Sequence, residues 1–359
     1  MLSNFIDKVI KTAETFKNKY LIVLVANVEN ITTHFSNYKD TPIQSEFLSL
    51  LECNEILYAI RSLGYEAICY TDELDFIEAI INKKIVTTKR ICVINIAQKG
   101  TAIGRKSLIP SFCDLNKIIY TNSDAYICSF ARNKFHWYKF LQNHTKNLLV
   151  SWCYSFRDKW IFGEKPAYGT KVIAKLGVES SSIGLTQENV FVYNEKQDKF
   201  LDDLSNKYKQ RLIVQKFVSG YEIEVPILSD GYSFIALPPV GISMNSNKFI
   251  GDSILDYNIR YNHKYEFFNF DLYNHTLAKI IMKETESIAA AINLRGISRI
   301  DYRITPDNHF YITDINAHPH LTKDMSVYYA LNELGYKDYQ LGFAILIGLA
   351  ICNQSSSQS

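Results

Sequence analysis

The sequence predicts an α/β (α+β) protein in which a parallel sheet precedes a set of antiparallel strand pairs. Within residues 1–122, short buried apolar runs alternate with helical segments, which is typical of a parallel sheet. From residue 123 onward, strands come in pairs joined by short turns. Because 359 residues that are 47% hydrophobic can build two or three cores, we divide the chain at 1–122, 123–214 and 215–352. The polar tail 353–359 (NQSSSQS follows Cys352) is predicted to be disordered.

The elements of the first unit follow from local patterns. Apolar residues at helical spacing near the start (Phe5, Val9, Ile10 and Ala13) predict an amphipathic N-terminal helix within residues 1–18, expected to pack on its own domain. The run YLIVLVA predicts a buried parallel strand. The further predicted elements are helices at 46–63 (ended by Gly64), 73–83 and 107–116, and strands at 20–26, 66–70, 90–97 and 118–121.

The second half contains longer helices and paired strands. A serine-rich turn joins the first strand pair, and a polar turn at 305–308 joins the last. The predicted helices are 125–142, 198–208, 275–293 and an amphipathic stretch at 336–353. The predicted strands are 171–177, 189–194, 212–218 and 222–229, and the two runs of the hairpin 299–319.

Composition excludes several function classes. The net charge of +2, from 39 basic and 37 acidic residues, gives no electrostatic reason to expect a nucleic-acid partner. The seven cysteines contain no CxxC pair, which argues against a zinc site and a disulfide framework and favours a reducing compartment. No uninterrupted apolar stretch approaches about 18 residues, and the N-terminus lacks the pattern of a secretory signal. We therefore expect a cytoplasmic protein with small-molecule partners and no membrane partner.

The hairpin RIDYRITPDNHFYITDINAHP, from Arg299 to Pro319, is the most informative segment. Asp314 and Asn316 share one face of a strand, and pairing of the two runs brings Asp301 to that same face. Carboxylates this close together repel unless a cation compensates them, and Mg²⁺ suits a site with few carboxylates completed by nucleotide phosphates. The alternative is an ordinary surface hairpin with solvated acids.

Two further segments contain groups that can bind phosphate. Lys175 precedes the small, hydroxyl-rich turn 179–184, whose backbone N–H groups and hydroxyls can cradle an anion; the alternative is a serine-rich surface turn. Arg260, in the polar aromatic loop 256–261, can clamp a phosphate with two hydrogen bonds; the alternative is a solvated loop with one stacked tyrosine.

Other candidates are weaker when taken alone. The segment 215–218 connects two predicted strands and can present backbone groups to a flat heterocycle, with Glu222 placed to accept ribose hydroxyls; the alternative is a plain strand–turn–strand. His318 and His320 flank Pro319 directly after the acidic cluster, so we assign them to the substrate side in preference to metal binding.

Taken together, the order of these segments resembles the ATP-grasp fold and, within it, the D-alanine–D-alanine ligase family. The resemblance covers about residues 100–345 well and the first hundred residues only loosely. The matching segments are TNSDAYICSFARNK (121–134), KLGVESSSIG (175–184), QKFVSGYE (215–222), LDYNIRY (255–261), ISRID (297–301) and DINAHPHLT (314–322). The resemblance implies an ATP-grasp fold that follows an N-terminal parallel-sheet domain along the chain.

The resemblance also implies a reaction: ATP phosphorylates a carboxylate, and an amine attacks the acyl phosphate to form an amide, with Mg²⁺ (or Mn²⁺) as the metal. It assigns ATP phosphates to Lys134, Lys175 and Arg260, and the rest of the nucleotide to Gln215, Lys216, Val218 and Glu222. It assigns the metal to Asp301, Asp314 and Asn316, and the oxyanion of the tetrahedral intermediate to Arg299. It assigns the first amino acid to Ser181, Tyr261 and Glu46, with Glu46 about one position out of register.

The sequence departs from the family pattern mainly around the amino-acid substrates. Asp314 replaces a glutamate, and His320 replaces a glycine. Met325 stands where the family has a serine that meets the second substrate, although Ser326 is adjacent. The family's Gly-Glu-Asp-Gly is Gly-Arg-Lys-Ser at 104–107, with the charge reversed. We therefore expect His320, Met325 and Ser326 to lie on the substrate side.

Three functional hypotheses follow. The first is a D-alanine–D-alanine ligase or a dipeptide ligase of the same mechanism. The second is an ATP-grasp ligase for other amino-acid or peptide substrates in a biosynthetic pathway, which His320 and the Arg105–Lys106 pair favour. The third is a non-catalytic nucleotide-binding relative, against which the intact lysines and acidic residues argue. The sequence does not determine the substrates, their stereochemistry, the pathway or the oligomeric state, with a homodimer as one option.

Overall fold

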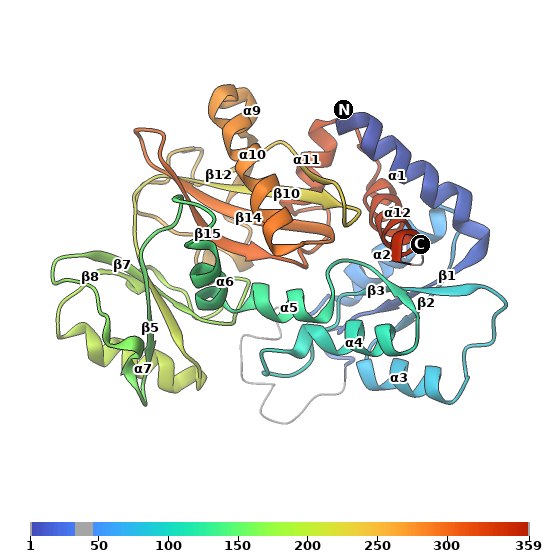
Figure 1. Cartoon of the computed structure of the whole chain (residues 1–359), viewed down its shortest axis with the longest axis horizontal. Coiled ribbons are helices and arrows are strands. Elements are labelled where there is room, and N and C mark those ends of the chain that lie inside the picture. Colours follow the sequence, from blue (N-terminus) through green and yellow to red (C-terminus); the bar gives the residue numbers. More distant parts are fainter. Residues whose placement is uncertain (1, 33–45, 358–359) are drawn as a thin grey trace.

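Three β-sheets organise the chain. The computed structural model describes residues 2–32 and 46–357, without the side chains of 354–357. Figure 1 shows the N-terminal sheet with its helices on the right, a second sheet at the lower left and a third sheet above the centre. The first sheet is parallel and the other two are antiparallel, as the alternation of elements in the first unit and the strand pairs of the second predict. The predicted domain boundaries themselves stay predictions.

The N-terminal sheet is four-stranded and parallel, in the order β2-β1-β3-β4. All six residues of β1 are buried, because helices cover both faces of a parallel sheet. Its strands are β1 (Tyr20–Val25), β2 (Glu66–Tyr70), β3 (Arg90–Asn95) and β4 (Ile119–Tyr120). The helices of this unit are α1 (Leu2–Phe16), η1 (Lys17–Lys19), α2 (Leu50–Ser62), α3 (Glu73–Ile81), η4 (Arg105–Ser107) and α4 (Leu108–Leu115).

The two ends of the chain pack together in the core of this first unit. The buried face of α1, with Ile6, Val9 and Ala13, lies against α12 (Tyr339–Ser357), and both termini appear on the same side in Figure 1. Gly348 permits the close approach, since a Cβ there would lie 2.3 Å from the Val9 carbonyl oxygen. The N-terminal helix therefore packs on its own domain, as expected.

The second sheet is five-stranded and antiparallel, in the order β6-β5-β9-β7-β8. Two short helices connect it to the first unit, and one helix packs against its face. Its elements are α5 (Ala125–Arg132), α6 (Lys134–Leu141), β5 (Ser151–Ser155), β6 (Lys159–Trp160), η5 (Ile161–Gly163), β7 (Lys171–Leu176), η6 (Gln187–Asn189), β8 (Val190–Val192), α7 (Gln197–Tyr208) and β9 (Leu212–Lys216).

The third sheet is six-stranded and antiparallel; β10 pairs with β14, and β14 with β15. Helix α10 packs its apolar face on this sheet. The elements are β10 (Tyr221–Ser229), β11 (Phe234–Ala236), β12 (Val240–Ser243), α8 (Tyr257–Tyr261), β13 (Glu266–Asn269), α9 (Phe270–Tyr273), α10 (His275–Ile292), β14 (Gly296–Ile304), β15 (Phe310–Asn316) and α11 (Ser326–Glu333).

Several predicted boundaries are wrong for local reasons. The helix predicted at 46–63 begins only at Leu50, because Ser49 and Glu52 form a capping box. The helix predicted at 125–142 is interrupted at Asn133, whose ψ of 96° is extended and whose side chain caps α6. The loop at 256–261 contains the one-turn helix α8, capped by Asp256. The short strands β5, β6, β11, β12 and β13 were not predicted.

The last helix differs from its prediction in character. The sequence predicts an amphipathic stretch at 336–353, but residues 342–351 are buried on all sides of the helix. The helix also continues to Ser357, into the tail for which the sequence predicts disorder. Among the described residues, none of the helices combines the length and apolar character needed to cross a membrane. All seven cysteines are free thiols.

Candidate active site

A single cleft gathers most of the predicted site residues. It encloses about 1470 Å³ of empty space, part of it open to solvent, and elements of all three sheet units contribute to its walls. The predicted residues that line it are Glu46, Lys134, Lys175, Ser181, Gln215, Lys216, Val218, Glu222, Arg260, Arg299, Asp301, Asp314, Asn316, His320 and Met325. Segments far apart in the sequence thus meet in one place.

The acidic face of the hairpin forms as the sequence predicts. Across β14 and β15, Asp301 is the register partner of Asp314, and Arg299 is the partner of Asn316. The four side chains therefore share one face of the sheet, and the register shifts only after Asp301. The backbone N–H of His318 donates to the side-chain oxygen of Asn316 at 3.0 Å, which fixes that amide.

Arg299 is the central cation of this face. Its Nε and Nη2 donate to the two oxygens of Asp301 at 2.7 and 2.9 Å, and its Nη1 lies 2.7 Å from Glu224 Oε2. Burial favours a lower pKa for Arg299, but the carboxylates of Asp301 and Glu224 outweigh it and raise that pKa. Burial also raises the pKa of Asp301, against the lowering effect of Arg299. Arg299 stays charged, and a nearby cation stabilises the ionised form of Asp301.

Two lysines face the acidic residues, the buried Lys134 and the half-buried Lys175. Lys134 Nζ donates to both oxygens of Asp314 at 2.8 and 2.7 Å, and Lys175 Nζ donates to the Thr313 carbonyl at 3.3 Å. Burial lowers the pKa of Lys175, and Asp314 opposes that effect. Asn133 places Lys134 by ending α5 and starting a new helix at the cleft. Both lysines therefore present positive charge to the cleft from elements outside the hairpin.

The serine-rich turn adopts a strained backbone. Ser181 and Ser182 have φ values of 54° and 56°, the left-handed region that non-glycine residues seldom occupy. The Ser182 hydroxyl donates to the Leu255 carbonyl at 2.6 Å, which ties the turn to the segment that carries Arg260. Within the described part of the chain, Ser181 makes no hydrogen bond through its hydroxyl, so that group is available at the cleft.

The connector between the two antiparallel sheets lies along the same cleft. Gln215 is buried and its side chain donates to the Ser151 hydroxyl at 3.3 Å, across β9 and β5. The Lys216 and Phe217 backbone N–H groups already bind Val150 and Lys171 carbonyls. Glu222 lies 3.6 Å from Arg303, a residue that sequence reasoning did not select.

Two predicted residues do not reach the cleft. Tyr261 is 62% exposed and stacks on Tyr257 at a ring-centroid distance of 5.8 Å, because one helical turn places both rings on the same side of α8. Ser326 is fully buried at the start of α11, with its hydroxyl 3.5 Å from Arg299 Nη1. Met325 does line the cleft, as does His320. The substrate roles assigned to these residues stay predictions.

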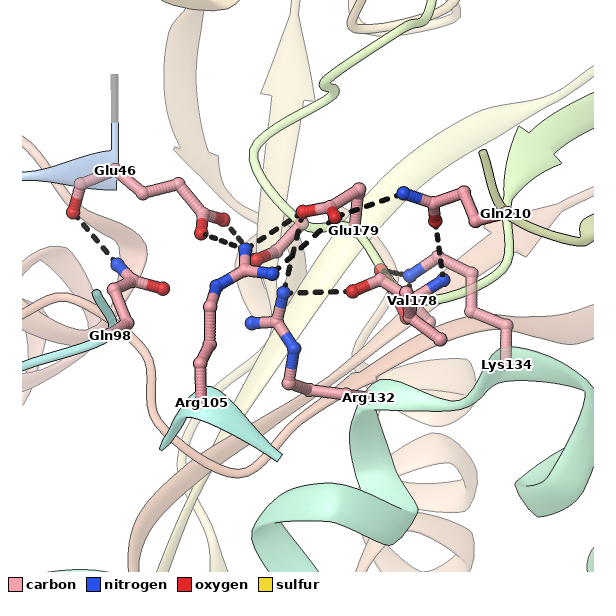
Figure 2. Close-up of polar contacts among 10 residues, drawn as sticks. Glu46, Gln98, Arg105, Arg132, Lys134, Val178, Glu179 and Gln210 are labelled. Carbon is pink, nitrogen blue, oxygen red and sulfur yellow. Dashed lines mark hydrogen bonds and ion pairs between the residues drawn. The ribbon is translucent and has the colours of Figure 1, made fainter. Parts of the chain in front are cut away.

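Glu46 is buried in an ion-pair network that the sequence did not predict (Figure 2). Its Oε2 accepts from Arg105 Nη2 at 3.0 Å, and its Oε1 accepts from the Ser180 hydroxyl. Arg105 also reaches Glu179 Oε2 at 2.8 Å. Burial raises the pKa of Glu46, but nearby Lys106, Arg132 and Arg105 outweigh burial and lower it. Glu46 is therefore an anion with both oxygens engaged.

Other cleft residues that sequence reasoning missed belong to the same polar framework. Glu224 has the clearest sequence signal, since it alternates with Glu222 on β10 and pairs with Asp301 across β14. Arg132 donates to the Val178 carbonyl at 2.8 Å and approaches Glu179 at 3.4 Å (Figure 2). No local motif marks Arg132 on α5 as a site residue. Only the tertiary fold brings it to the turn 178–182.

The acidic face fits a hard divalent cation. Asp301, Asp314 and Asn316 supply oxygen donors on one face, and the two carboxylates form ion pairs with Arg299 and Lys134. A cluster of three His, Cys, Asp or Glu side chains suited to a metal does not occur among the described residues, and beside the two carboxylates this face offers the Asn316 amide oxygen. This donor set is typical of Mg²⁺ or Mn²⁺ sites that bound phosphates complete.

A family model and several curated proteins match this chain. The family model described as "D-ala D-ala ligase C-terminus" matches residues 153–344. The D-alanine–D-alanine ligase of Natranaerobius thermophilus is 29% identical over 262 residues, 70% of this chain and 68% of that protein. The ligase of Petrotoga mobilis is 25% identical over 281 residues, covering 77% and 84%.

Solved structures agree on the fold. The D-alanine–D-alanine ligase of Bacillus anthracis complexed with ATP superposes with a TM-score of 0.69 at 14% identity, covering 94% of this chain and 99% of that one. The VanG D-Ala:D-Ser ligase of Enterococcus faecalis superposes with a TM-score of 0.66 at 16% identity, covering 92% and 99%.

The fold and the cleft define the class: an ATP-grasp ligase in which two antiparallel sheets enclose a cationic and acidic site behind an N-terminal parallel sheet. Within that class, the chain belongs to the D-alanine–D-alanine ligase family. It is therefore an ATP-dependent enzyme that forms carbon–nitrogen bonds, and the expected fold and family are confirmed. The comparisons give no support to the non-catalytic alternative.

Proposed function

We propose that this enzyme phosphorylates the carboxylate of a first, amino-acid-like substrate with ATP and transfers the acyl group to the amine of a second. The observation that carries the proposal is the convergence of Lys134, Lys175 and Arg299 on the acidic face of β14 and β15. Attack of carboxylate oxygen on the γ-phosphorus breaks the bond to ADP. Attack of the amine on the acyl carbon then expels phosphate, which takes the amine proton.

In this scheme the chain's own residues position the nucleotide phosphates and neutralise the charge on them and on the oxyanion. Lys134 and Lys175 bind phosphate oxygens as point charges, with Lys134 exchanging its partner Asp314 for the nucleotide. Arg260 lines the cleft and, in the described part of the chain, has no carboxylate within 4.0 Å, so it is available to a third phosphate. Arg299, held by Glu224 and Asp301, donates to the developing oxyanion.

Asp301, Asp314 and Asn316 would hold Mg²⁺, or Mn²⁺, and the metal would supply charge neutralisation at the phosphates. Lys175 and the connector at 215–222 would enclose the nucleotide, with Glu222 toward the ribose. The location in the cytoplasm, the absence of a nucleic-acid partner and a homodimeric assembly stay predictions.

The direct test is phosphate release from ATP with Mg²⁺, screened over single amino acids and pairs, with D-alanine as the reference. We expect release that depends on both a carboxylate and an amine substrate, and a product with one new amide detected by mass spectrometry. ATP hydrolysis that no carboxylate or amine stimulates would contradict the ligase proposal. A chelator that leaves the rate unchanged would contradict the metal assignment.

A further inference from the structure

Arg303 is a buried cation of the cleft that belongs neither to the acidic face nor to the groups proposed for phosphate. It lies on β14 two residues after Asp301, lines the cleft and is 4% exposed. The connector between the two antiparallel sheets runs directly against this strand, since a Cβ on Gly220 would lie 2.1 Å from the Ile304 carbonyl oxygen. An arginine is seldom buried unless its donors have partners, so the partners of Arg303 indicate its role.

One end of the Arg303 guanidinium holds the segment 250–255, which leads from β12 to α8. Its Nη2 donates to the Gly251 carbonyl and, at 2.8 Å, to the Ser253 carbonyl. The Gly251 carbonyl also accepts from the Gly220 backbone N–H at 3.1 Å. The connector and the segment 250–255 therefore meet at one oxygen atom, and Arg303 ties both of them to β14.

The flat face of the guanidinium packs on an aromatic ring of the connector. The Arg303 Cζ lies 4.5 Å from the centroid of the Phe217 ring, a distance at which a cation and an aromatic ring attract each other. Phe217 forms an apolar cluster with Ile173 and Ile254, and all three line the cleft. Such a wall suits the flat heterocycle proposed at 215–218, and Arg303 supports it from beneath the ring.

The other end of the guanidinium faces Glu222. Arg303 Nη1 lies 3.6 Å from Glu222 Oε2, and the two residues are register partners across β10 and β14. The Glu222 side chain is 22% exposed, and within the described part of the chain its carboxylate accepts no hydrogen bond. Glu222 therefore keeps its lone pairs for the hydroxyls of a ligand, while the charge of Arg303 restrains the direction in which they point.

We propose that Arg303 is a positioning residue for the nucleoside part of the nucleotide and that it acts through Glu222. The inference rests on the proposed function, which places the ribose at Glu222, and it names the residue that makes this site selective for ribose hydroxyls. A carboxylate already aligned by a planar guanidinium loses less freedom when it accepts a hydroxyl than a carboxylate that rotates freely. The same guanidinium holds Phe217 and the segment 250–255 around the site.

Calorimetric binding of ADP, 2′-deoxy-ADP and 3′-deoxy-ADP with Mg²⁺ measures this selectivity without turnover. We expect at least one deoxynucleotide to bind wild type at least about tenfold more weakly than ADP, because a hydrogen bond to a charged group is lost. Arg303→Met should reduce this preference at least about fivefold, and Arg303→Lys, which keeps the charge without the planar fork, should retain part of it. Arg157→Met is the matched control, because Arg157 also stacks on a phenylalanine, Phe156 at 5.4 Å, but does not line the cleft.

A double-mutant cycle separates action through Glu222 from a general disturbance of the cleft. Glu222→Gln alone should abolish most of the preference for ADP, since a neutral amide replaces the charged acceptor. Adding Arg303→Met to Glu222→Gln should then change the remaining preference by no more than about twofold. Glu222 is only partly buried, so Glu222→Gln keeps the test decisive if Arg303→Met does not fold.

The outcomes distinguish the inference from the ligase function. A wild type that binds all three nucleotides equally, a preference that survives Glu222→Gln, or an unchanged preference in folded Arg303→Met would overturn the inference and leave the ligase function intact. Effects of the two substitutions that add in full would overturn it as well. Nucleotide binding with the expected preference, but without an amide product from any pair of substrates, would instead overturn the ligase function and support the role of Arg303.

Discussion

Replacing Arg105 by methionine tests the buried network at the N-terminal end of the cleft. The Arg105 side chain is 1% exposed and lies 3.0 Å from Glu46 and 2.8 Å from Glu179. Removing one partner of a buried ion pair costs about 3–5 kcal/mol, because the remaining charge loses its compensation. Ser180 and Gln210 still donate to the two carboxylates, so we expect a loss near the lower end, about 3 kcal/mol.

Urea unfolding followed by circular dichroism measures this loss. Arg157→Met is the matched control, because Arg157 is exposed and such surface changes usually stay within about 0.5 kcal/mol. In a double-mutant cycle, Glu46→Gln together with Arg105→Met should cost less than the sum of the single changes by about 0.5–3 kcal/mol. A stability of Arg105→Met within about 0.5 kcal/mol of wild type would refute the assignment of a buried, coupled pair.

The same pair gives a pH dependence with a definite sign. Although burial alone would raise it, the folded pKa of Glu46 lies below its ordinary value of 4.5, because Lys106, Arg132 and Arg105 hold the carboxylate. Its ionisation therefore stabilises the fold fully above about pH 4.5, and this stabilisation is lost as the pH falls toward the folded pKa. Arg105→Met should make the urea midpoint fall less steeply below pH 4.5. An identical slope in both proteins would count against Arg105 as a partner of Glu46.

The remaining predictions concern catalysis. Lys134→Ala or Lys175→Ala should weaken ATP binding at least about tenfold in calorimetry, since each lysine is a point charge for phosphate; unchanged affinity in both variants would contradict their role. Asp301→Asn or Asn316→Ala should abolish ATP turnover while the melting curve stays cooperative, because the metal site loses one of few ligands; wild-type turnover in either would contradict the metal assignment. His320→Gly should change the ranking of amine acceptors more than it changes ATP affinity, with discrimination of about 1–3 kcal/mol; an identical ranking would show that His320 is structural.

Local sequence patterns predicted those parts of the molecule that depend on neighbouring residues. The parallel sheet follows from apolar runs such as 20–26, because a strand covered on both faces needs no alternation. The acidic face at Asp301 and Asp314 follows from the period of two residues along a strand and from a tight turn at 305–308. Short strands such as β11 and β12 escaped prediction, because three or four residues give too little periodicity.

Tertiary structure decided which charges meet at the amino-acid end of the cleft. Nothing local indicates that Arg105, at the start of η4, reaches Glu46 and Glu179, which lie 59 and 74 residues away in the sequence. Likewise, Tyr261 matches a motif but stacks outside the cleft, because the turn of α8 sets its direction. The sequence by itself determined the fold class, the family and the acidic face of β14 and β15, since these reside in contiguous strands and turns. Packing of distant segments determined the charge state of Glu46 and its place beside Arg105 and Lys106, because burial and long-range charge pairs exist only in the folded chain.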